Sequence, residues 1–319
     1  MILVVGGLAD RVTELVCARL AERGYQYRLL DLGYYPSGFQ VDWRWARSGL
    51  SGSIRCNGWT LDLDELTGVY VRYLGMDGRE PPSGVEPTWA PAMYFEYETG
   101  LMALIEDLPC VVVNRLAGGM SNSSKPYQAQ LIRECGLRIP PTLITNDPES
   151  AHRFYDEHHG DVIYKSLSGI RSIVRRVERE HLDRFPLLRH CPAQFQAFIP
   201  GDDVRVHTVG DELFATRVRS DAVDYRYGAR DGHDVAMEPT EVPDTVAAAC
   251  LRLARRLDLL LTGIDLKMTP DGDFYCFEVN PSPGFLFYEQ RARQPISAAL
   301  AELLKRGEER VTEGAITMR

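Results

Sequence analysis

The sequence lacks paired cysteines and long apolar runs. Its 7 cysteines lie singly along 319 residues, and none stands at the short paired spacing of a zinc site or a redox motif. This distribution favours a reduced setting, and we predict a cytoplasmic protein. No segment approaches the roughly 18 consecutive apolar residues of a membrane span, and the apolar start lacks the length and the basic flank of a signal peptide. We therefore expect no membrane partner.

The chain also lacks an excess of positive charge. It carries 36 Lys and Arg residues against 45 Asp and Glu residues, and its net charge at pH 7 is -9. Proteins that bind nucleic acid or anionic membranes need clustered cations that neutralise phosphates. The composition argues against both partners and leaves small molecules or peptides as the expected ones. Assembly into a homo-oligomer stays open.

A set of hard oxygen ligands stands near the C-terminal end of the chain. Two runs of strand-forming residues flank the turn Pro270-Asp271-Gly272, which predicts a β-hairpin. Alternate residues of a strand share a face, so Glu278 and Asn280 point the same way. A hairpin loop of two or four residues places Asp265 on that face as well, whereas a three-residue loop turns it away.

These three residues have two interpretations. An acidic hairpin is often only a solvated surface. Asp265 and Glu278, however, lie inside apolar or aromatic segments, where a lone carboxylate is costly unless it is paired or binds a cation. Two carboxylates and an amide oxygen suit Mg²⁺, which fills its remaining positions with water and nucleotide phosphates. We predict a magnesium site at Asp265, Glu278 and Asn280. The same ligands would also suit Mn²⁺.

Two lysines precede the hairpin at positions suited to phosphate. Lys125 stands at the start of a predicted helix, with Pro126 in the first turn, where a missing N–H does no harm. Lys165 ends the predicted strand 161–165 and is followed by a small polar loop. Each could be an ordinary surface lysine, and together they predict contacts to nucleotide phosphates.

Alternating arginines follow between residues 203 and 226. The pattern places Asp203, Arg205 and His207 on one face of a strand, and Arg219 lies on the next strand. The repeated alternation predicts a sheet face lined with guanidinium groups, which bind carboxylates and phosphates in a bidentate way. A merely solvated charged face is the alternative. Residues 226–243 are predicted to form a long loop.

The segments Gly263-Ile264-Asp265 and Glu278-Val279-Asn280-Pro281-Ser282-Pro283-Gly284 resemble the metal-binding end of ATP-grasp ligases. The resemblance is strongest to the branch that contains ribosomal-protein glutamate ligases and graspetide (microviridin-type) macrocyclases. It can be followed from about residue 111 to 285. It implies an α/β (α+β) fold with an N-terminal parallel α/β domain and two subdomains that clamp ATP. The implied divisions are residues 1–116, 117–195 and 196–319.

The resemblance also implies roles for residues around the nucleotide. Gln196, Phe198 and Ile199 match the hinge whose backbone reads the adenine edge. Ala197 stands where many relatives carry an acidic residue, so Asp203 is the candidate to supply that contact.

Several arginines match positions that handle the transferred group. Arg205, Arg219 and Arg226 resemble the arginines that meet the γ-phosphate, the acyl phosphate or the acceptor. Arg72 resembles a strand arginine that faces the cleft in graspetide-type ligases, and the alternative for it is an ordinary salt-bridged residue.

The implied reaction is ATP-dependent ligation of a carboxylate to an amine. The cofactors are ATP and two magnesium ions, and the intermediate is an acyl phosphate. An amide-forming ligase of amino-acid or natural-product biosynthesis is the preferred interpretation. A ligase that forms ester or amide crosslinks on a ribosomal precursor peptide is the alternative within the family. A kinase-like or non-catalytic ATP-binding protein is the alternative from another class.

Overall fold

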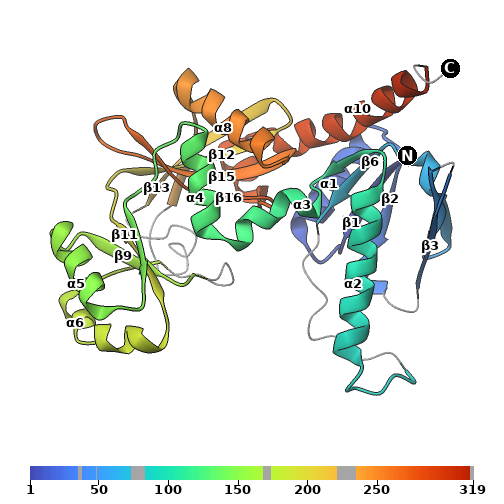
Figure 1. Ribbon diagram of the computed structural model, residues 1–319. Coiled ribbons are helices and arrows are strands. Elements are labelled where there is room, and N and C mark those ends of the chain that lie inside the picture. The colour runs from blue at the N-terminus through green and yellow to red at the C-terminus, as the bar shows by residue number, and fades with distance from the viewer. Residues whose placement is uncertain (35–37, 48, 73–82, 168–173, 221–234, 317–319) are drawn as a thin grey trace.

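The computed structural model describes residues 1–34, 38–47, 49–72, 83–167, 174–220 and 235–316. It comprises an N-terminal domain, a central subdomain and a C-terminal subdomain, and the C-terminal subdomain lies between the other two (Figure 1). The described helices do not include one long and apolar enough to cross a membrane.

The N-terminal domain is built on a parallel sheet of order β2-β1-β6-β7. Its strands are β1 (Ile2–Gly6), β2 (Tyr27–Asp31), β6 (Gly68–Val71) and β7 (Val111–Val113), and its helices are α1 (Arg11–Glu22) and α2 (Ala90–Asp107). All of β1 is buried, as its continuous apolar sequence predicts for a central strand of a parallel sheet. Asp10 caps α1 by accepting a hydrogen bond from the backbone N–H of Thr13.

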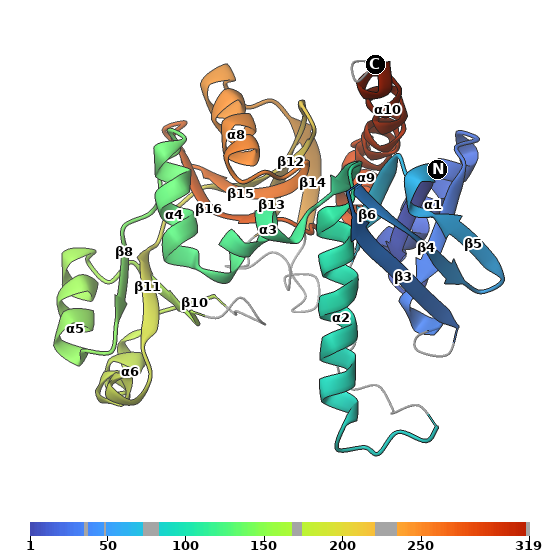
Figure 2. The same ribbon diagram turned by 45° about the vertical axis from the view of Figure 1, so that its right-hand side comes forward.

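A second, antiparallel sheet extends from this domain between β2 and β6. Its strands are β3 (Phe39–Ala46), β4 (Gly49–Cys56) and β5 (Trp59–Asp62), with short 3₁₀ helices η1 (Leu32–Tyr34) and η2 (Leu63–Glu65) on either side. Figure 2 shows this sheet at the outer end of the molecule, beside the long helix α2.

The central subdomain is an antiparallel sheet of order β10-β9-β11-β8. The strands are β8 (Thr142–Thr145), β9 (Val162–Lys165), β10 (Arg175–Arg176) and β11 (Ala193–Ala197); the helices are α5 (Pro148–Glu157), α6 (Arg179–Leu182) and η4 (Phe185–His190). The helices α3 (Leu116–Gly119), η3 (Met120–Ser123) and α4 (Lys125–Glu134) precede this sheet in the chain, and α4 packs into the core of the C-terminal subdomain through Leu131 and Ile132. Phe154 of α5, Phe185 of η4 and Phe195 of β11 form one buried cluster. This cluster occupies one face of the sheet and leaves the face that carries Gln194 and Gln196 for the neighbouring subdomain.

The C-terminal subdomain is an antiparallel sheet of order β14-β13-β12-β15-β16. Its elements are β12 (Asp202–Val209), β13 (Glu212–Ser220), β14 (Val235–Thr240), α8 (Asp244–Arg256), β15 (Leu261–Met268), β16 (Phe274–Asn280), α9 (Leu286–Ala292) and α10 (Ile296–Ile316). The loop predicted over 226–243 is wrong for 235–240, because those residues pair with β13 as β14. Helix α8 covers one face through a core that includes Val206, Leu253 and Ile264.

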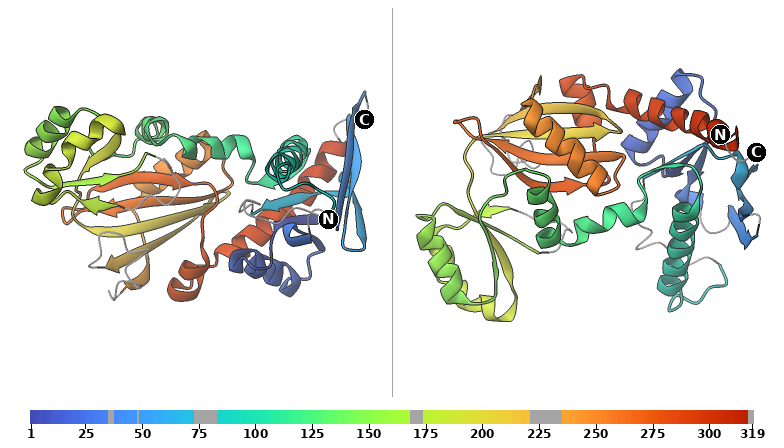
Figure 3. Two further views of the ribbon diagram at one scale, coloured as in Figure 1. Left: turned by 90° about the horizontal axis from the view of Figure 1, so that it is seen from below. Right: turned by 45° about the horizontal axis from the view of Figure 1, so that its top comes forward.

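Helix α10, near the C-terminus, packs against the N-terminal domain. It runs from the C-terminal subdomain back across the parallel sheet of the N-terminal domain (Figure 3). Leu300 and Leu304 share a buried core with Ile2 and Val4 of β1. The approach requires glycine at residue 307, because a Cβ there would lie 2.2 Å from the carbonyl oxygen of Thr67. The N-terminal domain and the C-terminal subdomain therefore share one continuous core.

Candidate functional site

The hairpin of β15 and β16 brings the predicted oxygen ligands to one face. Asp265 lies directly opposite Glu278, and Gly263 lies opposite Asn280. The loop holds five residues, 269–273, between the paired Met268 and Phe274, rather than two, three or four. An odd loop would turn Asp265 away, and a β-bulge between Asp265 and Leu266 restores the register. The ligand face depends on this bulge.

Helix α4 holds the outer edge of the hairpin through Gln128, which the sequence reasoning missed. The buried side chain of Gln128 donates to the carbonyl oxygen of Val279 at 2.9 Å and accepts from its N–H at 2.8 Å. Val279 lies between Glu278 and Asn280 on the edge strand β16. The Gln128 side chain thus makes the two backbone hydrogen bonds that a neighbouring strand would make to Val279. Val279 lies between two of the candidate ligands.

Asn114 anchors the other end of the hairpin. Its Nδ2 donates to the carbonyl oxygens of Leu261 and Pro281, both at 2.6 Å, and its Oδ1 accepts from the N–H groups of Leu260 and Leu261. One amide from the end of β7 therefore ties the start of β15 to the segment after β16. Asn280 itself accepts a hydrogen bond from the N–H of Ser282 at 2.8 Å, which orients its side chain.

Arg205 lies on the same face as the candidate ligands. It pairs with Asp265 across β12 and β15, and its guanidinium forms an ion pair with that carboxylate. The side chain of Arg205 is 8% exposed and that of Asp265 is 23% exposed. The space for the guanidinium exists because residue 263 is glycine; a Cβ there would lie 1.9 Å from Nη2 of Arg205.

His207 is the next residue on that face of β12. It is fully buried, and its ring packs edge-on against Tyr288 of α9 with 4.7 Å between ring centroids. Burial, and secondarily the charge of Arg205, lowers the pKa of His207 well below its ordinary value of 6.5. The imidazole is therefore neutral at pH 7.

The structure separates the predicted arginines. Arg205 lies opposite Thr216, so Arg217 and Arg219 of β13 point to the other face of the sheet. There Arg219 pairs with Glu238 at 3.1 Å and approaches Asp202 at 3.9 Å. The prediction that Arg205 and Arg219 line one face is wrong, because the strand register, which the sequence pattern does not contain, sets the phase of β13. Arg226 lies outside the described residues.

Asp203 lies on the Arg205 face of β12, as the alternation predicts, and forms an ion pair with Lys267 of β15, with 3.2 Å between Oδ1 and Nζ. Its contact with the nucleotide stays a prediction.

The two predicted lysines approach the same loop from different elements. Lys125 begins α4, with Pro126 in its first turn, as predicted. Its Nζ donates to the carbonyl oxygen of Ser166 at 3.0 Å, and Ser166 directly follows Lys165. Lys165 is buried at the end of β9, opposite Gln194 of β11. Two cationic side chains from separate elements therefore lie near residues 165–166.

A cavity of about 380 Å³ lies beside these lysines, between the central sheet, α4 and the hairpin. Lys125, Thr142, Gln194, Gln196 and Phe277 are among the residues that line it. In the described part of the chain its lining does not include Phe198 or Ile199.

Those two hinge residues follow β11 on the connection to β12. The guanidinium of Arg176 stacks on the Phe198 ring at 3.9 Å from its centroid, and the N–H of Phe198 donates to the carbonyl oxygen of Asp161.

Arg72 connects the N-terminal domain to the segment after the hairpin. Its Nε donates to Asp10 at 3.2 Å, and its Nη1 donates to the carbonyl oxygen and the hydroxyl of Ser282 at 2.7 and 2.8 Å. The side chain is therefore a salt-bridged residue that also holds residues 282–283 in place. A ligand role for Arg72 stays a prediction.

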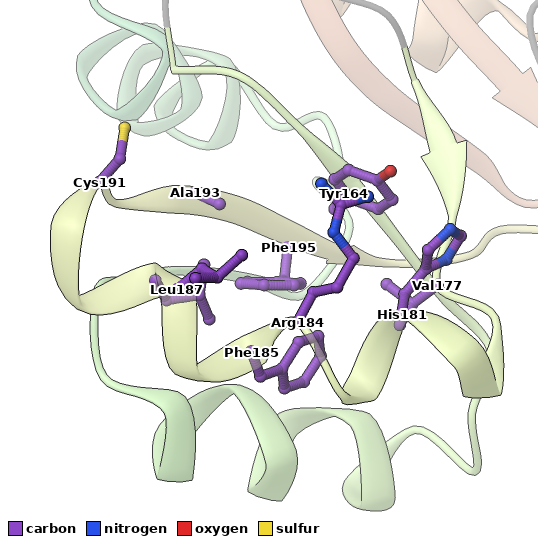
Figure 4. Close-up of a pocket in the computed structure, with 10 residues that line it drawn as sticks. Tyr164, Val177, His181, Arg184, Phe185, Leu187, Cys191, Ala193 and Phe195 are labelled. Carbon is purple, nitrogen blue, oxygen red and sulfur yellow. The ribbon is translucent and has the colours of Figure 1, made fainter.

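Two further cavities lie outside this cluster. One of about 650 Å³ separates α2 from residues 114–123 and reaches Pro281 and Ser282, next to the hairpin. The other, of about 210 Å³, is lined entirely by residues between Tyr164 and Phe195 of the central subdomain. Figure 4 shows Arg184 extending across that second cavity toward Tyr164, above the ring of Phe185.

The donor set of the hairpin is two carboxylates and one amide. Within the described ranges no group of three or more His, Cys, Asp or Glu side chains gathers as a metal cluster. The described cysteines are unpaired, and burial raises the pKa of the Cys250 thiol to about 12.

The sequence is similar to a known protein family and to curated proteins. Residues 122–304 match the family model described as a RimK-like ATP-grasp domain. The chain is 27% identical over 225 residues to N-acetylaspartylglutamate synthase A of Mus musculus; the match covers 66% of this chain and 58% of that protein. The chain thus spans less than two thirds of that relative's length.

Solved structures resemble the chain over nearly its whole length. ATP-grasp ligase PsnB, complexed with a phosphomimetic variant of its minimal precursor, Mg and ADP, matches with a TM-score of 0.79 and 29% identity, covering 96% of this chain and 98% of that one. Macrocyclase MdnC of Microcystis aeruginosa MRC, bound with precursor peptide MdnA, matches with a TM-score of 0.82 and 26% identity, covering 96% and 100%.

Proposed function

Since the chain belongs to the RimK-like ATP-grasp family, and is thus an ATP-grasp ligase, we propose that it ligates carboxylates of a peptide substrate through acyl phosphates. The likeness to two peptide-bound ligases over almost the whole of both chains supports a peptide. That likeness includes the N-terminal domain, which lies outside the matched family model. It therefore supports the precursor-peptide ligase, which the sequence analysis gives as the alternative, over the amino-acid or natural-product ligase preferred there.

The donors on the hairpin fit magnesium. Asp265, Glu278 and Asn280 would hold the metal, since hard cations prefer carboxylate and amide oxygens and Mg²⁺ needs few of them. A bound Mg²⁺ supplies positive charge to nucleotide phosphate oxygens. Gln128 and Asn114 hold the backbone on either side, so the donors are positioned before any ligand arrives.

The cations of the chain then act on the phosphates. Lys125 and Lys165 hold the phosphates of ATP near residues 165–166, with the nucleoside in the adjoining cavity. Arg205 lies beside the carboxylate pair and stabilises charge on the transferring phosphoryl group.

The reaction has two steps. A substrate carboxylate oxygen attacks the γ-phosphorus of ATP, and the bond from that phosphorus to the β-phosphate oxygen breaks, releasing ADP. An amine or hydroxyl then attacks the acyl carbon, and the bond to the phosphate oxygen breaks, releasing phosphate while the nucleophile loses its proton. Positioning and electrostatics suffice for both steps. The cavity of about 650 Å³ beside Ser282 offers room for a peptide segment next to the hairpin.

The test is ADP release with defined acceptors. Short synthetic peptides rich in Asp or Glu and in Lys or Thr are expected to stimulate ADP release and to lose one water per crosslink by mass spectrometry. Amino-acid pairs serve as the comparison. Turnover with amino-acid pairs and none with peptides would replace the peptide by a small-molecule substrate.

That second candidate has its own support. The likeness to N-acetylaspartylglutamate synthase A suggests an enzyme that joins two small amino-acid derivatives. A kinase-like protein would instead leave a stable phosphorylated product. A non-catalytic ATP-binding protein would keep its biological activity after the substitution Glu278→Ala.

A further inference from the structure

The cavity of about 650 Å³ beside the hairpin has apolar walls that are open to solvent. It lies between α2 and residues 114–123, and we call it the α2 groove. Phe95, Leu116 and Met120 line it, and they are 66%, 52% and 57% exposed. Single exposed apolar residues are common on protein surfaces, whereas apolar side chains gathered in one cavity mark a binding surface.

One stripe of α2 forms a wall of this groove. Phe95, Glu98, Met102 and Glu106 follow one another at intervals of three and four residues, which places them along one side of the helix. The Oε2 atom of Glu106 accepts a hydrogen bond from the N–H of Leu116 at 2.9 Å, which orients that carboxylate. The wall therefore offers apolar contact and negative charge side by side.

The charge around the groove is mostly negative. Residues 83–114, which include all of α2, contain five acidic residues and no Lys, Arg or His. Arg115 is the basic residue of the lining, and its guanidinium donates to the carbonyl oxygens of Ile105, Leu108 and Cys110 at 3.2, 2.8 and 3.0 Å. These N–H groups are directed to the backbone at the C-terminal end of α2. A ligand with apolar side chains and a cation complements this surface.

The groove is continuous with the candidate metal site. Pro281 and Ser282 line it, and they directly follow Asn280 in the chain. Asn114 lines it as well and donates to the carbonyl oxygen of Pro281 at 2.6 Å. A peptide whose carboxylate reaches the hairpin would therefore place its neighbouring residues in the groove.

We propose that the α2 groove is the specificity site for the peptide residues that flank the reacting carboxylate, and that it selects apolar side chains accompanied by Lys or Arg. This inference rests on the proposed function, which assigns a peptide substrate to the chain. Phe95, Leu116 and Met120 contact the apolar side chains, and Glu98 and Glu106 attract the cation. Acidic flanking residues are disfavoured because they meet carboxylates of the same sign.

The test compares KM and kcat for synthetic peptides in the ADP-release assay. The peptides share one reacting Glu and one Lys acceptor and differ only in the flanking segment, which contains Leu with Arg, Leu with Gln, or Leu with Glu. KM is expected to rise in that order, by about threefold at each step, while kcat stays the same. A site that binds flanking residues changes affinity and leaves the chemical steps alone.

Two variants of the groove have matched controls. Phe95→Ser is expected to raise KM about tenfold for all three peptides, whereas Phe287→Ser, at a side chain that is 56% exposed on α9, is expected to retain it. Glu98→Gln is expected to reduce the preference for Arg over Gln about threefold. Glu96→Gln removes an equal charge from an exposed position of the same helix outside the groove lining and is expected to retain that preference.

Two measurements without turnover complete the test. Fluorescence anisotropy of the labelled Leu and Arg peptide reports binding to the nucleotide-free protein, and Phe95→Ser is expected to weaken it about tenfold. Sedimentation velocity is expected to be the same for Phe95→Ser and the unmodified protein. Because Phe95 is exposed, its replacement is not expected to unfold the chain.

The outcomes separate this inference from the proposed function. Turnover of peptides with a KM that depends neither on the flanking segment nor on Phe95 overturns the inference and leaves the peptide ligase standing. A change of sedimentation in Phe95→Ser without a change of KM would assign the groove to a second copy of the chain and also overturns it. Turnover of amino-acid pairs and of no peptide overturns both.

Discussion

Arg205 and Asp265 lie directly opposite each other on neighbouring antiparallel strands and form an ion pair next to Glu278. The guanidinium occupies space that only a glycine at position 263 leaves open. A candidate metal ligand is thus neutralised by a residue of the chain itself. A metal ion at the hairpin would have to share this carboxylate with Arg205.

Replacement of Arg205 is predicted to separate metal affinity from turnover. Arg205→Met removes a positive charge beside Asp265, so Mn²⁺ binding to the nucleotide-free protein is expected to tighten by about tenfold, measured by electron paramagnetic resonance. ADP release is expected to fall by about 100-fold, since the transferring phosphoryl group loses a cation. Lys267→Met, which removes an equal charge paired with Asp203, is the control. Unchanged Mn²⁺ affinity in Arg205→Met would contradict the sharing of Asp265.

Glu278 is predicted to be required for turnover and not for folding. Glu278→Gln keeps the shape of the side chain and removes its charge, so ADP release is expected to fall by at least about 100-fold while the thermal midpoint changes little. Asp271→Asn, at the exposed turn of the same hairpin, is expected to retain full activity. Activity of Glu278→Gln within twofold of the unmodified protein would remove Glu278 from the metal site.

Gln128 is predicted to support both the edge of the sheet and the metal site. Gln128→Ala leaves the N–H and carbonyl of Val279 without their partner, which is expected to lower the free energy of unfolding by about 1–3 kcal/mol in urea titrations. The Mg²⁺ concentration for half-maximal activity is expected to rise about 10-fold to 100-fold. Gln130→Ala serves as the matched control for stability. A loss of stability with an unchanged Mg²⁺ requirement would limit Gln128 to a structural role.

His207 is predicted to make the protein less stable in mild acid. Its pKa is lowered in the folded state, so below pH 6.5 the unfolded chain binds a proton that the folded chain does not. Stability from this group is complete above pH 6.5 and decreases as the pH falls below it. Between pH 7.5 and 5.5 the unmodified protein is expected to lose about 1.4 kcal/mol more unfolding free energy than His207→Phe. Equal losses in the two proteins would show that His207 titrates normally.

Much of the candidate site follows from local chemistry. The oxygen ligands at Asp265, Glu278 and Asn280 can be found because carboxylates inside apolar strands need a partner. The start of α4 at Lys125 follows from Pro126. The fold class and the family, predicted from the motifs, are confirmed by the match of residues 122–304 and by the solved structures. The roles of the site residues stay predictions.

Other parts of the site could not be predicted because they depend on register and on distant contacts. Period-two alternation correctly places Asp203, Arg205 and His207 on one face, but it cannot relate that face to β13, where Arg219 points the other way. Gln128 meets Val279 across 151 residues of chain, and nothing in its sequence surroundings distinguishes it from Gln130. Its role exists only because α4 lies along the open edge of β16.

The sequence by itself determined which chemical groups are present and which of them alternate along a strand: hard oxygen donors, two phosphate-suited lysines and an arginine among apolar residues. Only the tertiary structure decided how these groups meet. A bulge brings Asp265 opposite Glu278 despite a five-residue loop, and Gln128 of α4 completes the hydrogen bonds of Val279 on the edge strand. The physical reason is that side-chain periodicity is a local property of the backbone, whereas strand register and hydrogen-bond direction depend on partners far away in the chain.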